Sequence, residues 1–509
     1  MLGGYSAQKY SSTSNTITGL GFPNDDIPYL SAATSVTGSS AYAAYSLVSA
    51  IGRINYSYKG KYLLQGAIRN DGSSLFGANS RYGTFPSVSA GWIVSDESFM
   101  ERFKNIGFLK LRGSYGVTGN NTFSGYYTAQ STTSNYYYDY NNVVTQGTSI
   151  GNLGNKDLQW ERNLQLDLGF DLSILKDRIT LTYDYYHKNT NHLIQSRPLP
   201  TSSGYSTILD NVGAIALWGH EVTVSTVNLT GKLKWSSSLN VSFDRNRIKA
   251  LVSPGYLRRN NTVSSDYYRQ QVGHPLGAFY GFVFEGLYRN ADDLAKSAKY
   301  LATPTNPNGS SDIGTIKVKD INGDGVIDDV NDRTFIGNPT PTFTGGFTNY
   351  FSYKDFDCSI STAFDLGGQI LNAAKWAYQT NMDGSRVPLA AALNHWRSET
   401  DPGSGIYPRT KTGTTAIGRE VNSQWLESAS YLAIKNVTIG YNLHLKQNRT
   451  FRGLRVYASA QELFVFTKYS GMNPEISLSG QDPTQGIKVD EEGYPIPRTL
   501  SFGLSASFK

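Results

Sequence analysis

The 509-residue sequence has little charge, one cysteine and no long apolar run. Charged residues make up 17% of the chain, against about 25% in typical soluble proteins. No run of about 18 apolar residues occurs, so the sequence does not predict a transmembrane helix. Cys358 is the single cysteine, which excludes an internal disulfide and leaves the redox compartment open. The net charge of +6 is small for this length, and the basic residues are scattered, so a nucleic-acid-binding protein is not indicated.

What the sequence does contain is alternation. Aromatic residues make up 13%, with 35 Tyr, and there are 51 Gly. Between Asn163 and Lys188, apolar and polar residues alternate on both sides of a turn at Lys176-Asp177-Arg178. Successive side chains of a β-strand point to opposite faces, so this stretch predicts a hairpin with one apolar face. Each strand is about ten residues long, which is the length that a tilted strand needs to cross a bilayer.

The same pattern recurs along the chain and predicts about fourteen strands. They are expected at residues 2–10, 42–58, 61–70, 85–94, 107–117, 164–173, 179–188, 217–228, 232–244, 342–352, 356–365, 431–443, 454–464 and 499–508. Short turns alternate with long segments at residues 119–162, 189–216, 245–341, 366–430 and 467–498. Outer-membrane barrels show this asymmetry, with short periplasmic turns and long extracellular loops. We therefore predict an all-β fold, a transmembrane antiparallel β-barrel, with a secreted soluble β-protein as the alternative.

Several motifs occur in a recognisable order along the chain. They are Arg69–Gly77, Phe85–Trp92, Leu109–Asn120, Lys317–Gly325, Ile336–Pro341 and the Phe508-Lys509 terminus. In these motifs the chain resembles the SusC/RagA-type TonB-dependent outer-membrane transporters. The resemblance covers essentially the whole chain and implies the C-terminal part of a barrel of about 22 strands closed by an N-terminal plug. It also implies that the plug, the first strands, the TonB-contacting segment and the signal peptide lie outside this chain. A fourteen-stranded barrel that closes by itself is the alternative.

By this resemblance we expect an integral protein of the bacterial outer membrane that imports oligosaccharides or peptides. The implied partners are a SusD-like surface lipoprotein as lid, the TonB complex, membrane lipid and the substrate, in a dimer of transporter–lid pairs. The alternatives are a passive porin-like channel, and an outer-membrane hydrolase or structural barrel. No phosphate loop of the G-x-x-x-x-G-K-[ST] type occurs, and we expect no enzyme and no organic cofactor.

One segment resembles a calcium loop. Asp320, Asn322 and Asp324 occupy the first, third and fifth positions of an EF-hand-like pattern, and Gly325 the sixth. The backbone carbonyl of Val326 is expected as a further ligand, with Asp328 at position nine. Position twelve is Asn331, and Asp332 comes one residue late. The alternatives are a structural Ca²⁺ ion held by Asp320, Asn322, Asp324, Val326, Asp328 and Asp332, and a surface turn satisfied by its own backbone.

Aromatic residues supply the remaining candidates. Six tyrosines of one long segment could stack on sugar rings or peptides, or could pack the loop onto its neighbours: Tyr126, Tyr127, Tyr136, Tyr137, Tyr138 and Tyr140. Trp92, Trp160 and Trp235 are predicted to anchor the barrel at the membrane interface. Phe502, Leu504 and Phe508 face outward on the last strand, and the resemblance implies that they form the C-terminal signal of the barrel.

Overall fold

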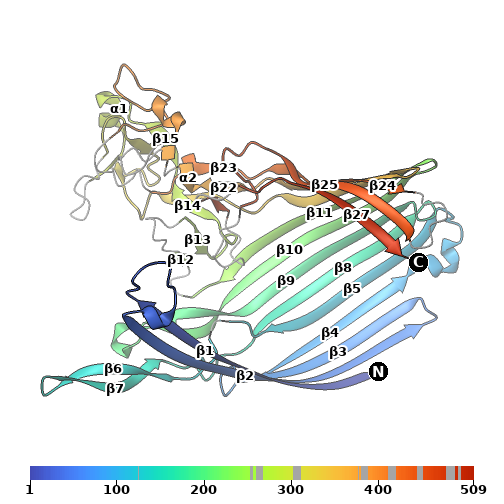
Figure 1. Cartoon of the computed structure of the whole chain (residues 1–509), viewed down its shortest axis with the longest axis horizontal. Coiled ribbons are helices and arrows are strands. Elements are labelled where there is room, and N and C mark those ends of the chain that lie inside the picture. Colours follow the sequence, from blue (N-terminus) through green and yellow to red (C-terminus); the bar gives the residue numbers. More distant parts are fainter. Residues whose placement is uncertain are drawn as a thin grey trace. The chain divides into compact units, whose positions relative to one another are not determined.

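A single fourteen-stranded sheet dominates the computed structural model (Figure 1). The structure describes residues 1–509 except 124, 253–255, 259–266, 302–310, 376–377, 380–387, 411–419, 444–450, 477–487, 491–494 and 509. The strands of the sheet, in spatial order, are β1 (Leu2–Leu20), β2 (Ser35–Tyr58), β3 (Tyr62–Ser73), β4 (Tyr82–Ile93), β5 (Ile106–Asn120), β8 (Glu161–Ile174), β9 (Ile179–Pro198), β10 (Thr207–Thr230), β11 (Leu233–Ala250), β20 (Phe343–Tyr353), β21 (Phe356–Leu366), β24 (Tyr431–Leu443), β25 (Phe451–Thr467) and β27 (Thr499–Phe508). All fourteen predicted strands are confirmed. Their spatial order is also their order along the chain, as expected for strands joined by antiparallel connections.

The alternation along each strand separates two faces. On β27 the large apolar side chains share one face and are exposed, with Leu500 at 70%, Phe502 at 86% and Leu504 at 65%, while Ser501 and Ser505 lie on the other face. Apolar side chains continue this face on other strands. Leu504 on β27 pairs with Val456 on β25, and Phe351 on β20 pairs with Trp235 on β11. Apolar side chains that remain exposed after folding need an apolar solvent, and a barrel presents such a face to lipid.

Several strands are longer than predicted. The first was expected at residues 2–10, but β1 has 19 residues and pairs with β2 from Leu2 to Leu20. The segment 189–216 was predicted to be a long connection, and this is wrong, because β9 continues to Pro198 and β10 begins at Thr207. His192 has a positive φ of 59°, which interrupts the alternation and hides the strand. Beyond the bilayer neither face must be apolar, so the period-two signal fades there.

The chain forms two compact units. Unit 1 comprises Met1–Trp92, Arg112–Asp167 and Lys188–Ile215, and unit 2 comprises Ile93–Leu111, Leu168–His187 and Ala216–Lys509. Unit 1 holds a separate hairpin, β6 (Thr132–Tyr140) with β7 (Val143–Asn152), inside the segment predicted as a loop. Lys509 and residues 444–450 of a predicted connection lie outside the described residues.

In unit 2 the long connections contain further structure. Their strands are β12 (Tyr256–Arg258), β13 (Arg269–Gln271), β14 (Phe279–Phe282), β15 (Phe284–Leu287), β16 (Lys299–Tyr300), β17 (Ile316–Val318), β18 (Val326–Ile327), β19 (Arg333–Gly337), β22 (Gln369–Asn372), β23 (Leu426–Ser428) and β26 (Val489–Asp490), and their α-helices are α1 (Ala291–Lys296) and α2 (Ala373–Lys375). Short 3-10 helices span Leu30–Ala32, Val94–Asp96, Ser98–Met100, Thr201–Ser203, Ala390–Asn394 and Ser423–Trp425. Within the described ranges, no helix has the length and apolar character to cross a membrane.

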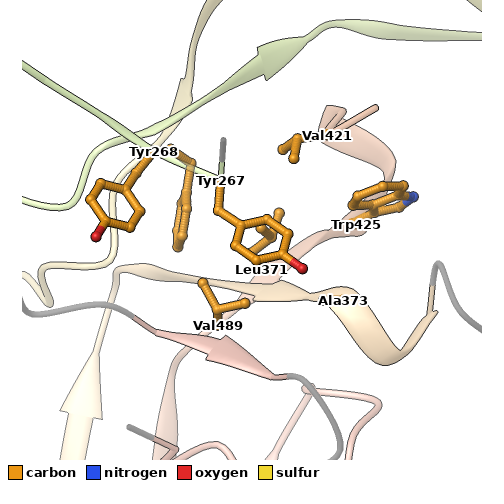
Figure 2. Packing of buried hydrophobic residues seen from close by; sticks show 8 residues of the cluster. Tyr267, Tyr268, Leu371, Ala373, Val421, Trp425 and Val489 are labelled. Carbon is orange, nitrogen blue, oxygen red and sulfur yellow. The ribbon is translucent and has the colours of Figure 1, made fainter. Parts of the chain in front are cut away.

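Among the described residues, these connections enclose three buried clusters, the smallest of which consists of Ile370, Ala429 and Tyr469. We call the first the loop core, which consists of Tyr267, Tyr268, Phe279, Leu371, Ala373, Val421, Trp425 and Val489 (Figure 2). The second consists of Phe282, Leu287, Ile316, Val318, Ile327 and Trp396. Phe279 and Phe282 are 0% exposed, so the connections of unit 2 form water-excluding cores of their own.

Candidate functional site

The six tyrosines predicted to bind a ligand fall into two groups. Tyr126 stacks on Tyr10 and on Tyr45, with 6.1 Å between ring centroids in each pair. The hydroxyl of Tyr127 accepts a hydrogen bond of 3.1 Å from the backbone N–H of Ala44. Because Tyr10 lies on β1 and Ala44 and Tyr45 on β2, these contacts hold the segment against that strand pair. Tyr126 and Tyr127 therefore pack onto that strand pair while remaining 36% and 37% exposed.

The other four tyrosines lie on the β6–β7 hairpin. Their exposed fractions are 61% for Tyr136, 61% for Tyr137, 47% for Tyr138 and 64% for Tyr140. Tyr136 is paired with Gly147 and Tyr138 with Thr145. The ring of Tyr138 lies over Gly147, where a Cβ atom would be 3.0 Å from it. The hairpin presents Tyr136, Tyr138 and Tyr140 on one face and Tyr137 on the other, so these rings are open to a ligand.

Three of the family-like motifs converge on one cavity in unit 1. The cavity has a volume of about 720 Å³, a size typical of small-molecule sites. Its lining comprises Leu2, Leu47, Ile51, Arg53, Gln65, Ala67, Ile68, Arg69, Asp71, Phe85, Ser87, Gly116, Val117, Thr118, Gly119, Asn121 and Trp160. Arg69 forms an ion pair of 2.6 Å with Asp71 and donates to the Ser49 hydroxyl at 3.0 Å. Sequence reasoning missed this cavity, although the shared parity of Arg69 and Asp71 was visible.

A buried aromatic cluster lies beside the cavity. It consists of Phe76, Phe85, Ala129, Leu158 and Trp160. The prediction that Trp160 is a membrane-interface anchor is wrong, because Trp160 is 5% exposed and its indole N–H donates to the carbonyl of Arg81 at 3.0 Å. A Cβ atom at Gly119 would be 2.1 Å from the Phe85 ring, so glycine is required there for the ring to pack.

The other two tryptophans lie on strands of the sheet. Trp92 stacks on Tyr62, with 6.4 Å between centroids, and Trp235 stacks on Phe351 at 5.7 Å. The indole N–H of Trp235 donates to the Asn349 side chain at 2.9 Å. These pairs have the apolar ring and polar tip that suit a membrane interface.

The opposite face of the sheet carries charge. In unit 1 the Arg112 guanidinium lies 3.7 Å from the Asp167 carboxylate. In unit 2 the Thr182 hydroxyl donates to Asp171 at 3.3 Å, and the Tyr186 hydroxyl donates to Asp244 at 2.5 Å. Asp167 and Asp171 are bound to the adjacent strands β5 and β9, and Asp244 on β11 is bound across β10 to β9, so ion pairs and hydrogen bonds cross-link the polar face. Across the described part of the chain, no three His, Cys, Asp or Glu side chains are grouped to hold a metal ion.

The predicted calcium loop, Asp320–Asp332, has the curl of such a loop. Gly323 and Gly325 have φ values of 75° and 83°, which glycine adopts without strain. The Asp320 carboxylate accepts the N–H groups of Gly323 at 2.6 Å and Gly325 at 2.9 Å. Ile327 is buried in the second cluster of unit 2. The backbone curl therefore fits a calcium loop, while both Asp320 oxygens are used by the backbone in this arrangement.

The closing side of the same loop fits less well. Asp332 is 0% exposed and accepts the N–H groups of Ile321 and Asp328, each at 2.8 Å. Both of its oxygens are therefore used by the backbone. The Asn331 N–H lowers the pKa of the Asp328 carboxyl and the Asn331 amide donates to it at 2.9 Å. The residues at the closing positions thus bind one another in this arrangement.

The predicted C-terminal signal residues lie together on β27. Phe502 and Phe508 are 86% and 66% exposed and lie on the same face as Leu504. The ring of Phe508 contacts that of Phe451 at 5.1 Å. They form an apolar row at the end of the sheet.

Comparisons with known proteins agree with this architecture. The family model described as TonB dependent receptor-like, beta-barrel, matches residues 2–463. The chain is 32% identical to TonB-dependent receptor P3 of Formosa agariphila, with 100% of this chain and 50% of that protein covered. It is 27% identical to the TonB-dependent receptor SusC of Bacteroides thetaiotaomicron, with 92% and 44% covered. The chain thus spans about half the length of the curated relatives it matches.

Its fold is similar to that of the RagAB peptide transporter. The TM-score is 0.79 at 24% sequence identity, and the alignment covers 99% of this chain and 52% of that one. The predictions of a barrel fold, of an integral outer-membrane location and of a protein that is not an enzyme are confirmed by the family. This chain belongs to the TonB-dependent receptor β-barrel family and resembles its SusC and RagA members.

Proposed function

We propose that this chain forms barrel wall and ligand-contacting loops of an active importer for oligosaccharides or peptides. The observation that carries the proposal is the β6–β7 hairpin, whose four tyrosines are exposed in a protein of a transporter family. A tyrosine ring offers an apolar surface with a hydroxyl at its tip, which suits both sugar rings and peptide side chains. A relative of the same fold is described as a peptide transporter.

The proposed partners follow from the same family. A SusD-like surface lipoprotein would cover the loops, as the resemblance to the SusC/RagA type implies, and the TonB complex would supply energy. The buried clusters of unit 2 support the proposal that a partner covers these loops. Loops with water-excluding cores of their own present a defined surface on which a partner can bind. A dimer of transporter–lid pairs is part of this proposal.

Uptake in cells tests the active mechanism. We expect import of the substrate to stop when a protonophore dissipates the proton-motive force. Uptake that continues unchanged would indicate a passive porin-like channel instead.

Binding to the hairpin tests the substrate contact. Replacing Tyr136, Tyr137, Tyr138 and Tyr140 together by serine removes aromatic contacts of about 0.5–1.5 kcal/mol each, so we expect at least tenfold weaker binding. The matched control replaces Val143 and Val144, which are exposed on β7, by serine. Unchanged affinity in the tyrosine variant would refute the contact.

We also propose a structural calcium ion in the Asp320 loop. It is supported by the glycine geometry and by Asp320, Asn322 and Asp324 at alternate positions, while Asp328 and Asp332 would have to turn from their backbone partners. Calcium should protect the loop from proteolysis in wild-type protein and not in Asp320→Asn. Asp329→Asn, an exposed neighbour outside the ligand pattern, serves as control, and protection that survives Asp320→Asn would contradict the site.

A further inference from the structure

On the apolar face of the sheet in unit 2, aromatic side chains form one band together with a histidine and an arginine. We define the outer band as Phe170, Tyr183, Tyr185, His220, Phe243, Arg245 and Phe343. His220 accepts or donates a hydrogen bond of 2.8 Å with the Tyr183 hydroxyl and lies 5.2 Å from the Tyr185 ring. Phe243 lies 6.0 Å from the His220 ring and 5.8 Å from that of Phe343.

The band lies on the same face as the apolar row of β27. Within β11 the residues Trp235, Phe243 and Arg245 share one parity, and the register pairs Trp235 with Phe351 and Phe351 with Cys358. From there the pairing continues through Ile439 and Ala458 to Phe502. Asp244 has the opposite parity and binds Tyr186. Histidine and arginine are therefore placed on the lipid-facing side, where polar groups are costly unless they reach the headgroups.

Distance along β11 gives the depth of the band. Arg245 is about ten residues beyond Trp235, which at about 3.3 Å per residue is roughly 33 Å along the strand. With a tilt of about 40°, this is roughly 25 Å in height, the thickness of the apolar band of an outer-membrane barrel. If Trp235 marks one interface, Arg245 lies at the other, at the level of the outer-leaflet headgroups.

The guanidinium of Arg245 is held by its neighbours through one nitrogen, and its other N–H groups are available to a ligand. Its Cζ atom lies 4.0 Å from the centre of the Phe243 ring, and its Nη1 donates to the carbonyls of Asp244 at 2.7 Å and Pro341 at 3.0 Å. Its Nε and Nη2 groups have no hydrogen-bond partner among the residues that the structure describes. The shared contact with Phe243 places the His220 ring within about 10 Å of the guanidinium.

We propose that Arg245 and His220, which both contact Phe243, bind the phosphate headgroup of an anionic lipid in the outer leaflet. A guanidinium with free N–H groups matches phosphate oxygens in geometry and charge. The surrounding rings contact the upper part of the acyl chains. The site depends on the outer-membrane location and not on the imported substrate.

Lipid titration of the purified full chain tests this site. Protein in a neutral detergent is titrated with phosphatidic acid and, separately, with phosphatidylcholine of the same chains, and bound lipid is counted by native mass spectrometry. A basic residue near a membrane surface contributes about a fivefold gain in affinity for anionic lipid. We expect Arg245→Gln to weaken phosphatidic acid binding about fivefold and to leave phosphatidylcholine unchanged.

The control is Lys234→Gln, which removes a cation from the opposite face of the same strand. It should leave both lipids unaffected, and Arg245→Lys should keep most of the preference. His220→Gln should reduce the preference less than Arg245→Gln. Equal binding of phosphatidic acid by wild type and Arg245→Gln would overturn the proposal. So would full competition by inorganic phosphate at equal concentration, which would indicate a site for free anions.

Discussion

The loop core and strand β27 both contain large apolar side chains, which are buried in the loop core and exposed on β27. Trp425 and Phe279, in the loop core, are 1% and 0% exposed, whereas Phe502 and Leu504 on β27 are 86% and 65% exposed. The connections of unit 2 fold against water and must hide their large side chains. The strand folds against lipid and can leave them outside, because acyl chains are as apolar as the side chains. Burial therefore measures stability in one region and not in the other.

The largest effect should come from truncation in the water-facing region. Trp425→Ala removes a fully buried ring, and such losses cost about 3–5 kcal/mol. We expect hydrogen exchange to show faster opening of the unit 2 connections, with the sheet unaffected. Phe502→Ala is the comparison variant and should leave both regions close to wild type. An equal response of the two variants would break the distinction between them.

A charged substitution on β27 should destabilise the protein, although truncation of an apolar side chain on the same strand should not. Leu504→Arg places a guanidinium against lipid, at a cost of about 2–4 kcal/mol near the middle of the bilayer. Unfolding in lipid vesicles by denaturant should show this loss. Ser505→Arg, on the opposite face of β27, should cost much less, and equal losses would contradict the assignment of the two faces.

A polar change inside the connections should have an intermediate effect. Asp332→Ala removes the acceptor of two backbone N–H groups. A fully buried donor left unpaired costs about 1–3 kcal/mol. Because Ile321 is 42% exposed, water replaces part of the loss, and we expect about 1–3 kcal/mol for the pair. We expect the loop from Asp320 to become sensitive to protease. Asp329→Ala, at an exposed neighbour, is the control, and resistance of both variants would show that Asp332 is dispensable.

The smallest effect should appear on acidification. Burial alone would raise the pKa of Asp293, but the N–H of Arg289 and the ammonium of Lys317 outweigh it and lower the pKa to about 2. A depressed pKa contributes stability that is present above about pH 4 and is lost as the pH falls through 2. We expect about 1 kcal/mol, since partly hydrated ion pairs are screened. Exchange near α1 should lose this dependence in Asp293→Asn, while unchanged behaviour of that variant would rule out Asp293 as its source.

The sequence was most informative where lipid imposes alternation. Ile179, Leu181 and Tyr183 identify β9 because their side chains must all face the same solvent. The alternation fails at His192, whose positive φ of 59° interrupts it. The prediction of a membrane-interface role also failed for Trp160. A tryptophan in a small water-excluding cluster cannot be distinguished by sequence from one at a membrane interface.

The candidate sites show the same limit. The tyrosines of residues 126–140 could be found from composition. That two of them contact the β1–β2 pair and four lie on the β6–β7 hairpin depends on the partners Tyr10, Ala44 and Tyr45, which lie far away in the sequence. The loop core joins segments that no local pattern connects. The calcium loop could be recognised by spacing, whereas the use of Asp332 by two backbone N–H groups could not.

The loop core also constrains the order of folding. Tyr268 and Val489 meet in it although roughly 220 residues separate them along the chain. Closing so long a segment costs chain entropy before any contact is gained, and contacts of high sequence separation form slowly. Strands β20, β21, β24 and β25 all lie between these two residues, and once paired they bring the ends together. The loop core is therefore completed after those strands have paired, so a folded loop core indicates that this part of the sheet has been assembled.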